Sequence, residues 1–154
     1  DGIMALFGVP QPLDGPERVA LETAREMLAR LKEVNALVRA RGLEPIRIGI
    51  GLHSGEAVVG HVGSDTRHEY TAIGDVVNVA SRLEGLTKEV GHPIVCSAAV
   101  ASAIGNHAGL ADLGELSIKG HSTMRVYGFI EREQESGNAE KTAAAGDPTL
   151  GVMT

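Results

Sequence analysis

Asn78 and Arg82 are the residues whose types and spacing point most directly to chemistry. They stand in the segment TAIGDVVNVASRLE, where apolar residues recur at helical spacing: Val76, Val79, Ala80 and Leu83. Residues four apart share one face of a helix, so Asn78 and Arg82 lie together, away from this apolar stripe. Arginine presents a planar fork of N–H donors with a permanent charge, so the pair is suited to bind an anion. A solvated helix face without a ligand fits the same spacing.

The composition is that of a globular domain. The chain has 154 residues, of which 43% are hydrophobic and 22% are charged, and this balance excludes wholesale disorder. Lys and Arg total 14 and Asp and Glu total 20, which gives a net charge of −6. An acidic chain is a poor binder of the nucleic-acid backbone, so we expect no nucleic-acid partner. A nucleotide needs only a few local charges and stays possible.

Other common sites are absent from the sequence. GIGLHSG has glycines at positions 49, 51 and 55, but Ser54 interrupts the dinucleotide-binding pattern and no helix follows. The six histidines show no metal-ligand spacing. Cys96 is the single cysteine and cannot form an internal disulfide, which fits a reducing compartment. No window holds about 18 apolar residues, so we expect no membrane span and no membrane contact by this segment.

Two long elements must position the Asn–Arg pair. The first is an amphipathic helix that we expect to begin at an Asp14 N-cap, with Glu17 as capping-box partner, and to end at Gly42. The second is the helix over residues 75–86, with Asp75 as its N-cap. Between them, residues 45–55 alternate apolar and other residues, which predicts a strand with one buried face.

The remaining segments complete an α+β pattern. We expect short strands over residues 3–7, 56–63, 92–97, 109–120 and 124–131, and a short helix over residues 98–105. This order predicts one largely antiparallel sheet with helices packed on it. Residues 132–154 are rich in Glu, Ala, Gly and Lys without periodicity, which predicts a disordered tail or linker.

Four blocks, in order, resemble the class III nucleotidyl cyclases: DGIMALFG, IGIGLHSGEAVVGHVGS, TAIGDVVNVASRLE and LSIKGHSTMRVYGF. The resemblance covers roughly residues 1–130. It implies a ferredoxin-like cyclase fold, a mostly antiparallel sheet with packed helices, with residues 1–131 forming a partial catalytic domain. The family's first strand and first helices would then lie upstream of Asp1.

The resemblance implies a role for five residues. Asn78 would orient the ribose, and Arg82 would stabilise charge on the α-phosphate in the transition state. Thr71 would help to select the purine, and Lys119 would contact the β- and γ-phosphates. Asp1 would be one of two aspartates that hold two Mg²⁺ or Mn²⁺ ions. Without the resemblance these last three are an ordinary strand residue, an exposed lysine and a turn residue.

Position 71 distinguishes subgroups of the family. Many animal adenylate cyclases have Asp there and guanylate cyclases typically have Cys, whereas threonine resembles a bacterial and soluble subgroup that makes cyclic AMP. The implied function is conversion of ATP to cyclic AMP and pyrophosphate in intracellular signalling, in the cytoplasm where ATP is found. Two alternatives stay open: a guanylate cyclase of the same fold, and an inactive cyclase-like domain used for dimerisation and signalling.

The resemblance also implies a homodimer with shared sites. One protomer would supply the metal aspartates, and its partner would supply Thr71, Asn78 and Arg82. The segment VGSDTRHEY would be a dimerisation arm, although an ordinary hairpin loop fits it equally. The other metal aspartate and the adenine-contacting lysine would lie upstream of Asp1, so we expect this chain by itself to be inactive.

Overall fold

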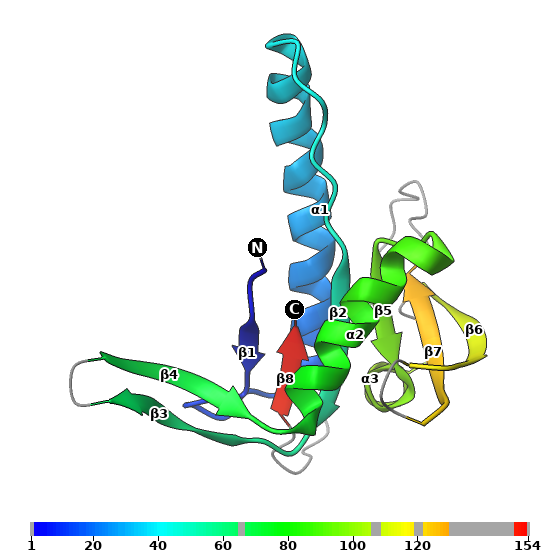
Figure 1. Cartoon of the computed structure of the whole chain (residues 1–154). Coiled ribbons are helices and arrows are strands. Elements are labelled where there is room, and N and C mark those ends of the chain that lie inside the picture. Colours follow the sequence, from blue (N-terminus) through cyan, green and yellow to red (C-terminus); the bar gives the residue numbers. More distant parts are fainter. Residues whose placement is uncertain (1, 65–66, 106–108, 119–121, 130–149, 154) are drawn as a thin grey trace.

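The computed structural model describes residues 2–64, 67–105, 109–118, 122–129 and 150–153 (Figure 1). Its elements, in chain order, are β1 (Ala5–Phe7), α1 (Pro16–Ala40), β2 (Ile50–Gly55), β3 (Val58–Ser64), β4 (Arg67–Ile73), α2 (Asp75–Val90), β5 (Ile94–Ser97), α3 (Ala98–Ile104), β6 (Leu110–Leu116), β7 (Met124–Phe129) and β8 (Leu150–Met153). The predicted α+β class is confirmed.

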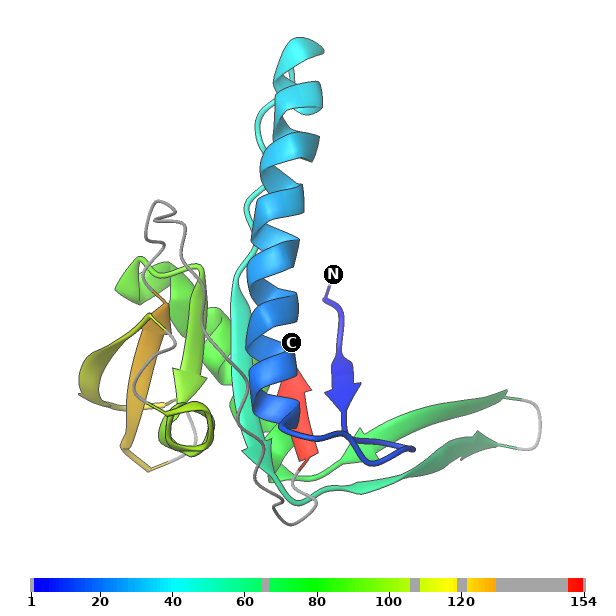
Figure 2. The same ribbon diagram turned by 180° about the vertical axis from the view of Figure 1, so that it is seen from behind.

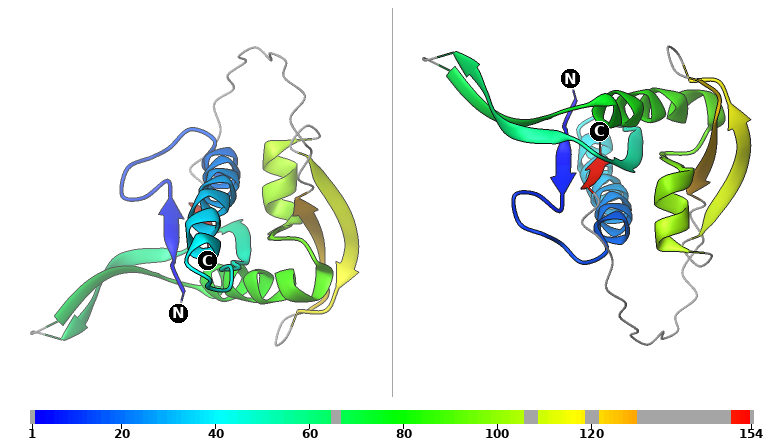
Figure 3. Two further views of the ribbon diagram at one scale, coloured as in Figure 1. Left: turned by 90° about the horizontal axis from the view of Figure 1, so that it is seen from above. Right: turned by 90° about the horizontal axis from the view of Figure 1, so that it is seen from below.

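The main sheet has the strand order β1-β8-β2-β5-β7-β6. Only β2 and β5 run parallel, and the other neighbours are antiparallel. β3 and β4 form a separate two-stranded ribbon, called the arm below, which extends away from the body of the molecule (Figures 1 and 3). The largely antiparallel sheet therefore matches the prediction. Residues 67–70, which belong to the segment expected to be an arm or a hairpin loop, lie in the second strand of the ribbon.

Helices cover both faces of the central strands. Ile50 and Leu52 of β2 belong to the core beneath α1, together with Val100 of α3. Val79 and Leu83 of α2 pack on the opposite face. Figures 2 and 3 show the two sides: α1 and α3 together on one, α2 on the other.

The prediction that the strand around β2 has one buried face is wrong. Gly51 is buried like Ile50 and Leu52 on either side of it, because α2 covers the face on which the glycine lies. The strand also starts later than predicted, since residues 43–49 run alongside α1 without a strand partner. An alternation of glycine with apolar residues therefore marks a strand covered on both faces rather than an exposed one.

α1 begins differently from its predicted start. Gly15 is the N-cap, with φ of 60°, and no side chain caps the helix, so the predicted Asp14 cap is wrong. Glu17 is buried and accepts a hydrogen bond of 2.6 Å from the Ser54 hydroxyl of β2 instead of closing a capping box. The contact fastens the first turn of α1 to the sheet. The predicted end is confirmed, because Gly42 follows the helix with φ of 72°.

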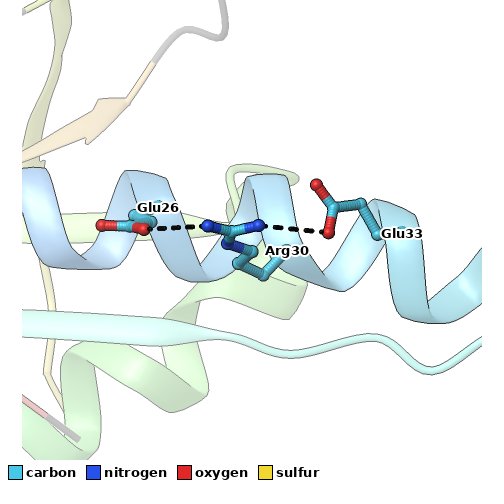
Figure 4. A network of polar contacts seen from close by, with 3 residues as sticks. All are labelled: Glu26, Arg30 and Glu33. Carbon is cyan, nitrogen blue, oxygen red and sulfur yellow. Dashed lines mark hydrogen bonds and ion pairs between the residues drawn. The ribbon is translucent and has the colours of Figure 1, made fainter.

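The second half of α1 projects beyond the sheet (Figures 1 and 2). Asn35 is buried there: its side-chain amide donates to the Ile46 carbonyl at 2.8 Å and accepts from the Ile46 N–H at 2.7 Å. These two bonds fasten the segment before β2 to the helix. The outer face carries the exposed pairs that Arg30 makes with Glu26 and Glu33 (Figure 4).

β8 corrects part of the prediction for residues 132–154. Leu150–Met153 pairs with β2 on one side and with β1 on the other, so it is an interior strand of the sheet rather than a disordered end. The physical reason is that four residues carry too little periodicity to signal a strand, whereas two flanking strands offer backbone partners on both edges. The expectation for residues 132–149 lies outside the described residues.

Candidate active site

The arm leads directly into the helix that carries the candidate residues. β4 ends at Ile73, Gly74 forms the turn, and α2 starts at Asp75, so Asp75 is the first helical residue and the predicted Asp75 cap is wrong. A side chain at Gly74 would meet the Glu56 carbonyl oxygen at 3.3 Å. The connection into β3 is therefore packed against the entry into α2. α2 also continues four residues beyond its predicted end, to Val90.

α2 presents Asn78 and Arg82 on the face turned away from β2. Ala80 and Glu84 lie against Gly51 of β2. At about 100° per residue, Asn78 and Arg82 lie roughly 160° and 200° around the helix from Ala80. The predicted common face therefore exists, and it points outward from the sheet.

Arg82 has an unsatisfied donor. Its Nη1 atom is buried and has no hydrogen-bond partner among the described residues, while Asn78 is exposed. A buried guanidinium nitrogen without an acceptor costs free energy, because water has been removed and nothing replaces it. An anion with oxygens in the plane of the guanidinium group would satisfy this donor.

Thr71 lies at the base of the arm, three residues before Gly74. It is opposite Gly60 in the antiparallel ladder, two residues from the Val58–Ile73 pair. Side chains two residues apart on a strand share a face, so Thr71 is on the same face of the arm as Val58 and Ile73. Thr71 is half-buried, and Val58 and Ile73 are 76% and 55% exposed.

Two of the predicted site residues, Lys119 and Asp1, lie outside the described residues. Ile118, which precedes Lys119, is buried in one cluster with Val79 and Leu83 of α2. The chain therefore approaches position 119 beside α2.

Two cavities in the described part of the chain, of about 520 and 640 Å³, lie beside Arg47, Ile48 and Gly49. Within the described part of the chain, no group of three or more His, Cys, Asp or Glu side chains could hold a metal ion. Because Asn78 and Arg82 line neither of these two cavities, neither cavity belongs to the face of α2 that carries them.

A buried hydroxyl beneath α2 has a hydrogen-bond partner. Ser97 of β5 is 1% exposed, and its hydroxyl lies 2.8 Å from Nδ1 of His53 on β2. Burial raises the pKa of the neighbouring Cys96 thiol to about 12, so this thiol is not a nucleophile at neutral pH.

The contacts of Gly49 and Gly51 with α2 were not predicted from the sequence. The signal was present, since Gly49 and Gly51 alternate with apolar residues in a strand. Glycine inside a strand often marks the close approach of another backbone. The sequence alone places these glycines on the unburied face of a strand and excludes a dinucleotide-binding loop, so it does not predict a helix against them.

Residues 1–131 match the family model described as the adenylate and guanylate cyclase catalytic domain. The chain belongs to this family. The cyclase domain is 39% identical over 123 residues to adenylate cyclase 1 of Rhizobium meliloti, a match that covers 80% of this chain and 18% of that protein. It is 41% identical over 104 residues to an adenylate cyclase of Anabaena cylindrica, with 65% of this chain and 20% of that protein covered.

Solved cyclase structures share the fold. The adenylyl cyclase CyaB from P. aeruginosa superposes with a TM-score of 0.67 at 28% identity, over 85% of this chain and 68% of that one. The guanylate cyclase domain of RhGC from Catenaria anguillulae, in complex with GTP, gives 0.68 at 27% identity, over 82% and 66%. The class III cyclase fold is thus confirmed. The chain spans about a fifth of the length of the curated relatives it matches.

None of the described helices is long and apolar enough to cross a membrane.

Proposed function

We propose that this cyclase domain contributes to an adenylate cyclase that converts ATP to 3′,5′-cyclic AMP and pyrophosphate. The observation that carries the proposal is the buried Arg82 Nη1 without a hydrogen-bond partner in the described residues, on the same face of α2 as Asn78. A phosphate oxygen is a suitable acceptor for this donor. Two relatives with 39% and 41% identity are named adenylate cyclases, which supports ATP as the substrate.

The reaction needs positioning and charge stabilisation more than covalent help from the protein. The ribose 3′-oxygen attacks the α-phosphorus, the bond to the bridging oxygen breaks, and pyrophosphate leaves. Asn78 would hold the ribose by hydrogen bonds, so that the 3′-oxygen stays in line with the leaving group. Arg82 would donate to the α-phosphate oxygens as their negative charge rises, an interaction stronger in the transition state than in the bound substrate. Lys119 would hold the β- and γ-phosphates.

The two Mg²⁺ or Mn²⁺ ions of the proposal need carboxylates beyond the described residues. Asp1 would supply one, and an aspartate upstream of this chain would supply the other. Such ions, when bound, lower the pKa of the attacking hydroxyl and stabilise the leaving oxygen.

A guanylate cyclase is the second candidate. A hydroxyl such as that of Thr71 donates and accepts hydrogen bonds, so its chemistry accommodates adenine and guanine alike. Two structural neighbours are guanylyl cyclases: Cya2, at 30% identity, and the GTP-bound domain of RhGC. The substrate must be decided by direct comparison of the two nucleotides.

The active unit that we propose is a homodimer with each site shared between protomers. The arm would lie against the partner with the face that carries Val58, Thr71 and Ile73. Exposed apolar side chains at its base suit such a contact, and Thr71 would thereby reach the shared site. Two-fold symmetry would make two equivalent sites. ATP as substrate would place the domain in the cytoplasm, or on the cytoplasmic side of a membrane-anchored protein.

The test measures cyclic nucleotide formation by the protein in its longest natural form, with ATP or GTP and Mn²⁺. We expect cyclic AMP from ATP, and a loss of at least about a hundredfold in kcat for Arg82→Ala. Arg30→Ala, which removes an exposed arginine from α1, is the control and should keep full activity. Full turnover by Arg82→Ala would overturn the proposal. Cyclic GMP as the main product would select the second candidate, and no product from a folded dimer would favour a signalling domain.

A further inference from the structure

Gly49 and Gly51 lie where α2 crosses the sheet. Gly51 is on the face of β2 that α2 covers, and Gly49 directly precedes the first residue of that strand. An added Cβ at either glycine would collide with α2. The motif that contains them has no role in the proposed reaction. Its glycines instead mark the closest approach of α2 to the sheet.

Gly51 makes the closer contact with backbone. An added Cβ would overlap the carbonyl oxygen of Ala80 and the amide nitrogen of Glu84, and would lie 3.0 Å from the carbonyl carbon of Leu83. These atoms belong to the helix backbone and cannot rotate away as the end of a side chain can. Because carbon atoms pack at about 3.5–4 Å, any side chain at position 51 would push α2 outward by roughly 1 Å or more.

We infer that Gly51 is a positioning residue for the cyclase reaction. It sets the depth at which α2 packs on the sheet, and α2 carries Asn78 and Arg82 on its opposite face. An outward shift of the helix therefore displaces both side chains together, relative to groups held by the other elements and by the partner protomer. The inference rests on the proposed function for its kinetic part, and on the packing of α2 for its structural part.

Gly49, the residue before β2, offers a contrasting position. An added Cβ there would overlap Oγ1 of Thr87, while the backbone and side-chain oxygens of Glu84 lie farther away, at 3.1 Å. Thr87 is buried, and its hydroxyl donates to the Glu84 carbonyl at 2.5 Å. Trimming Thr87 to alanine removes the colliding atom at position 49. It leaves the backbone collision at position 51 unchanged.

The experiment combines Gly49→Ala and Gly51→Ala with and without Thr87→Ala, in the longest natural form of the protein. Gly85→Ala is the matched control, because it also places a methyl group at a glycine of this helix–strand unit but meets nothing within 4 Å. Unfolding temperature and the kcat and KM for cyclic nucleotide formation are measured for each variant, the kinetics well below its unfolding temperature. Spin labels at Glu89→Cys on α2 and Ser102→Cys on α3 report the distance between the two faces of the sheet.

We expect Gly51→Ala to lengthen the label distance and to lower kcat by about a hundredfold, with KM changed less than about threefold. Adding Thr87→Ala should restore much of the unfolding temperature and kcat that Gly49→Ala loses. It should restore neither quantity in Gly51→Ala. A role in folding alone would lower the unfolding temperature without this kcat effect at a permissive temperature. If Gly51→Ala does not fold, the double-mutant cycle of Gly49→Ala and Thr87→Ala tests the same packing of α2 on the sheet.

Three results would overturn the inference: an unchanged label distance in Gly51→Ala, a kcat within about twofold of the parent protein, or an equal loss in Gly85→Ala. If the parent protein forms no cyclic nucleotide, the proposed function fails. The label distances and the Thr87→Ala rescue of the unfolding temperature then still decide whether the glycines set the depth of α2.

Discussion

The described surroundings of Arg82 leave one of its hydrogen-bond donors without an acceptor. One guanidinium nitrogen is buried with no partner among the described residues, although a shorter apolar residue would fill the same part of α2 without that cost. Sites that bind or catalyse are often less stable than the fold around them allows. The arrangement is therefore understandable for a residue whose acceptor arrives with the substrate.

The surroundings of Cys96, in contrast, make its thiol unreactive. It is fully buried on β5, and burial raises the pKa of its thiol from 9.0 to about 12. At pH 8, about one folded thiol in ten thousand is then ionised, against about one in ten at a pKa of 9.0. We expect a thiol reagent to label native protein far more slowly than protein unfolded in guanidinium chloride. Equal rates in the two states would contradict the burial of this residue.

The same shift predicts how stability depends on pH. The protonated thiol is favoured in the folded state, so its contribution is fully present below pH 9 and is lost as the pH rises from 9 towards 12. Other groups also titrate there, so Cys96→Ala serves as the reference. We expect the parent chain to lose stability faster than Cys96→Ala over this interval, by up to about 1.4 kcal/mol per pH unit. If the stability of the two proteins fell in parallel with pH, Cys96 would not be the source of the loss.

At the scale of elements, α1 is held to the chain that follows it by one buried amide. Asn35 makes two hydrogen bonds to the backbone of Ile46, beyond the edge of the sheet. We expect Asn35→Ala to lower the free energy of unfolding by about 1–3 kcal/mol, because both backbone groups of Ile46 lose their partner.

Arg30→Ala is the matched control for this change in urea unfolding. Arg30 is on the same helix, but its side chain is 66% exposed and its ion pairs span 3.3 and 3.7 Å. Exposed pairs of this kind contribute less than about 1 kcal/mol. Losses of equal size in the two variants would mean that the segment before β2 is not fastened by Asn35.

For the whole molecule, the arm decides how two copies could meet. A two-stranded ribbon is only marginally stable by itself, and this one carries exposed apolar side chains at its base. We expect Val58→Asp to weaken the proposed dimer by at least about tenfold in sedimentation experiments, because a charge would be buried in the contact.

Leu37→Asp tests whether any exposed apolar residue gives the same result. Leu37 is 66% exposed and lies near the end of α1, whose last residue is Ala40. That half of α1 projects away from the arm (Figure 1). The Leu37→Asp substitution should leave the dissociation constant of the dimer unchanged. A dimer weakened by Leu37→Asp and not by Val58→Asp would place the interface on α1.

The sequence by itself determined the α+β class, the family and the shared face of Asn78 and Arg82. These features depend on patterns within a few residues or on whole blocks of residues in a fixed order. Helical spacing alone brings residues 78 and 82 to one face, whatever the helix packs against. The first residues of α1 and α2 were predicted less accurately. The N-cap of each helix is a glycine, where the sequence predicted an aspartate.

Only the tertiary structure decided which surfaces meet. Sequence alternation could not show that α2 covers the glycine face of β2, because that contact joins residues about 30 positions apart. The four residues of β8 also could not be predicted as an interior strand, because that strand is defined by its backbone pairing with β1 and β2, which are distant in the sequence. The burial of Arg82 Nη1 and the bonds of Asn35 depend likewise on distant neighbours. Local pattern sets which face of an element is apolar, and packing between distant elements sets what lies against it.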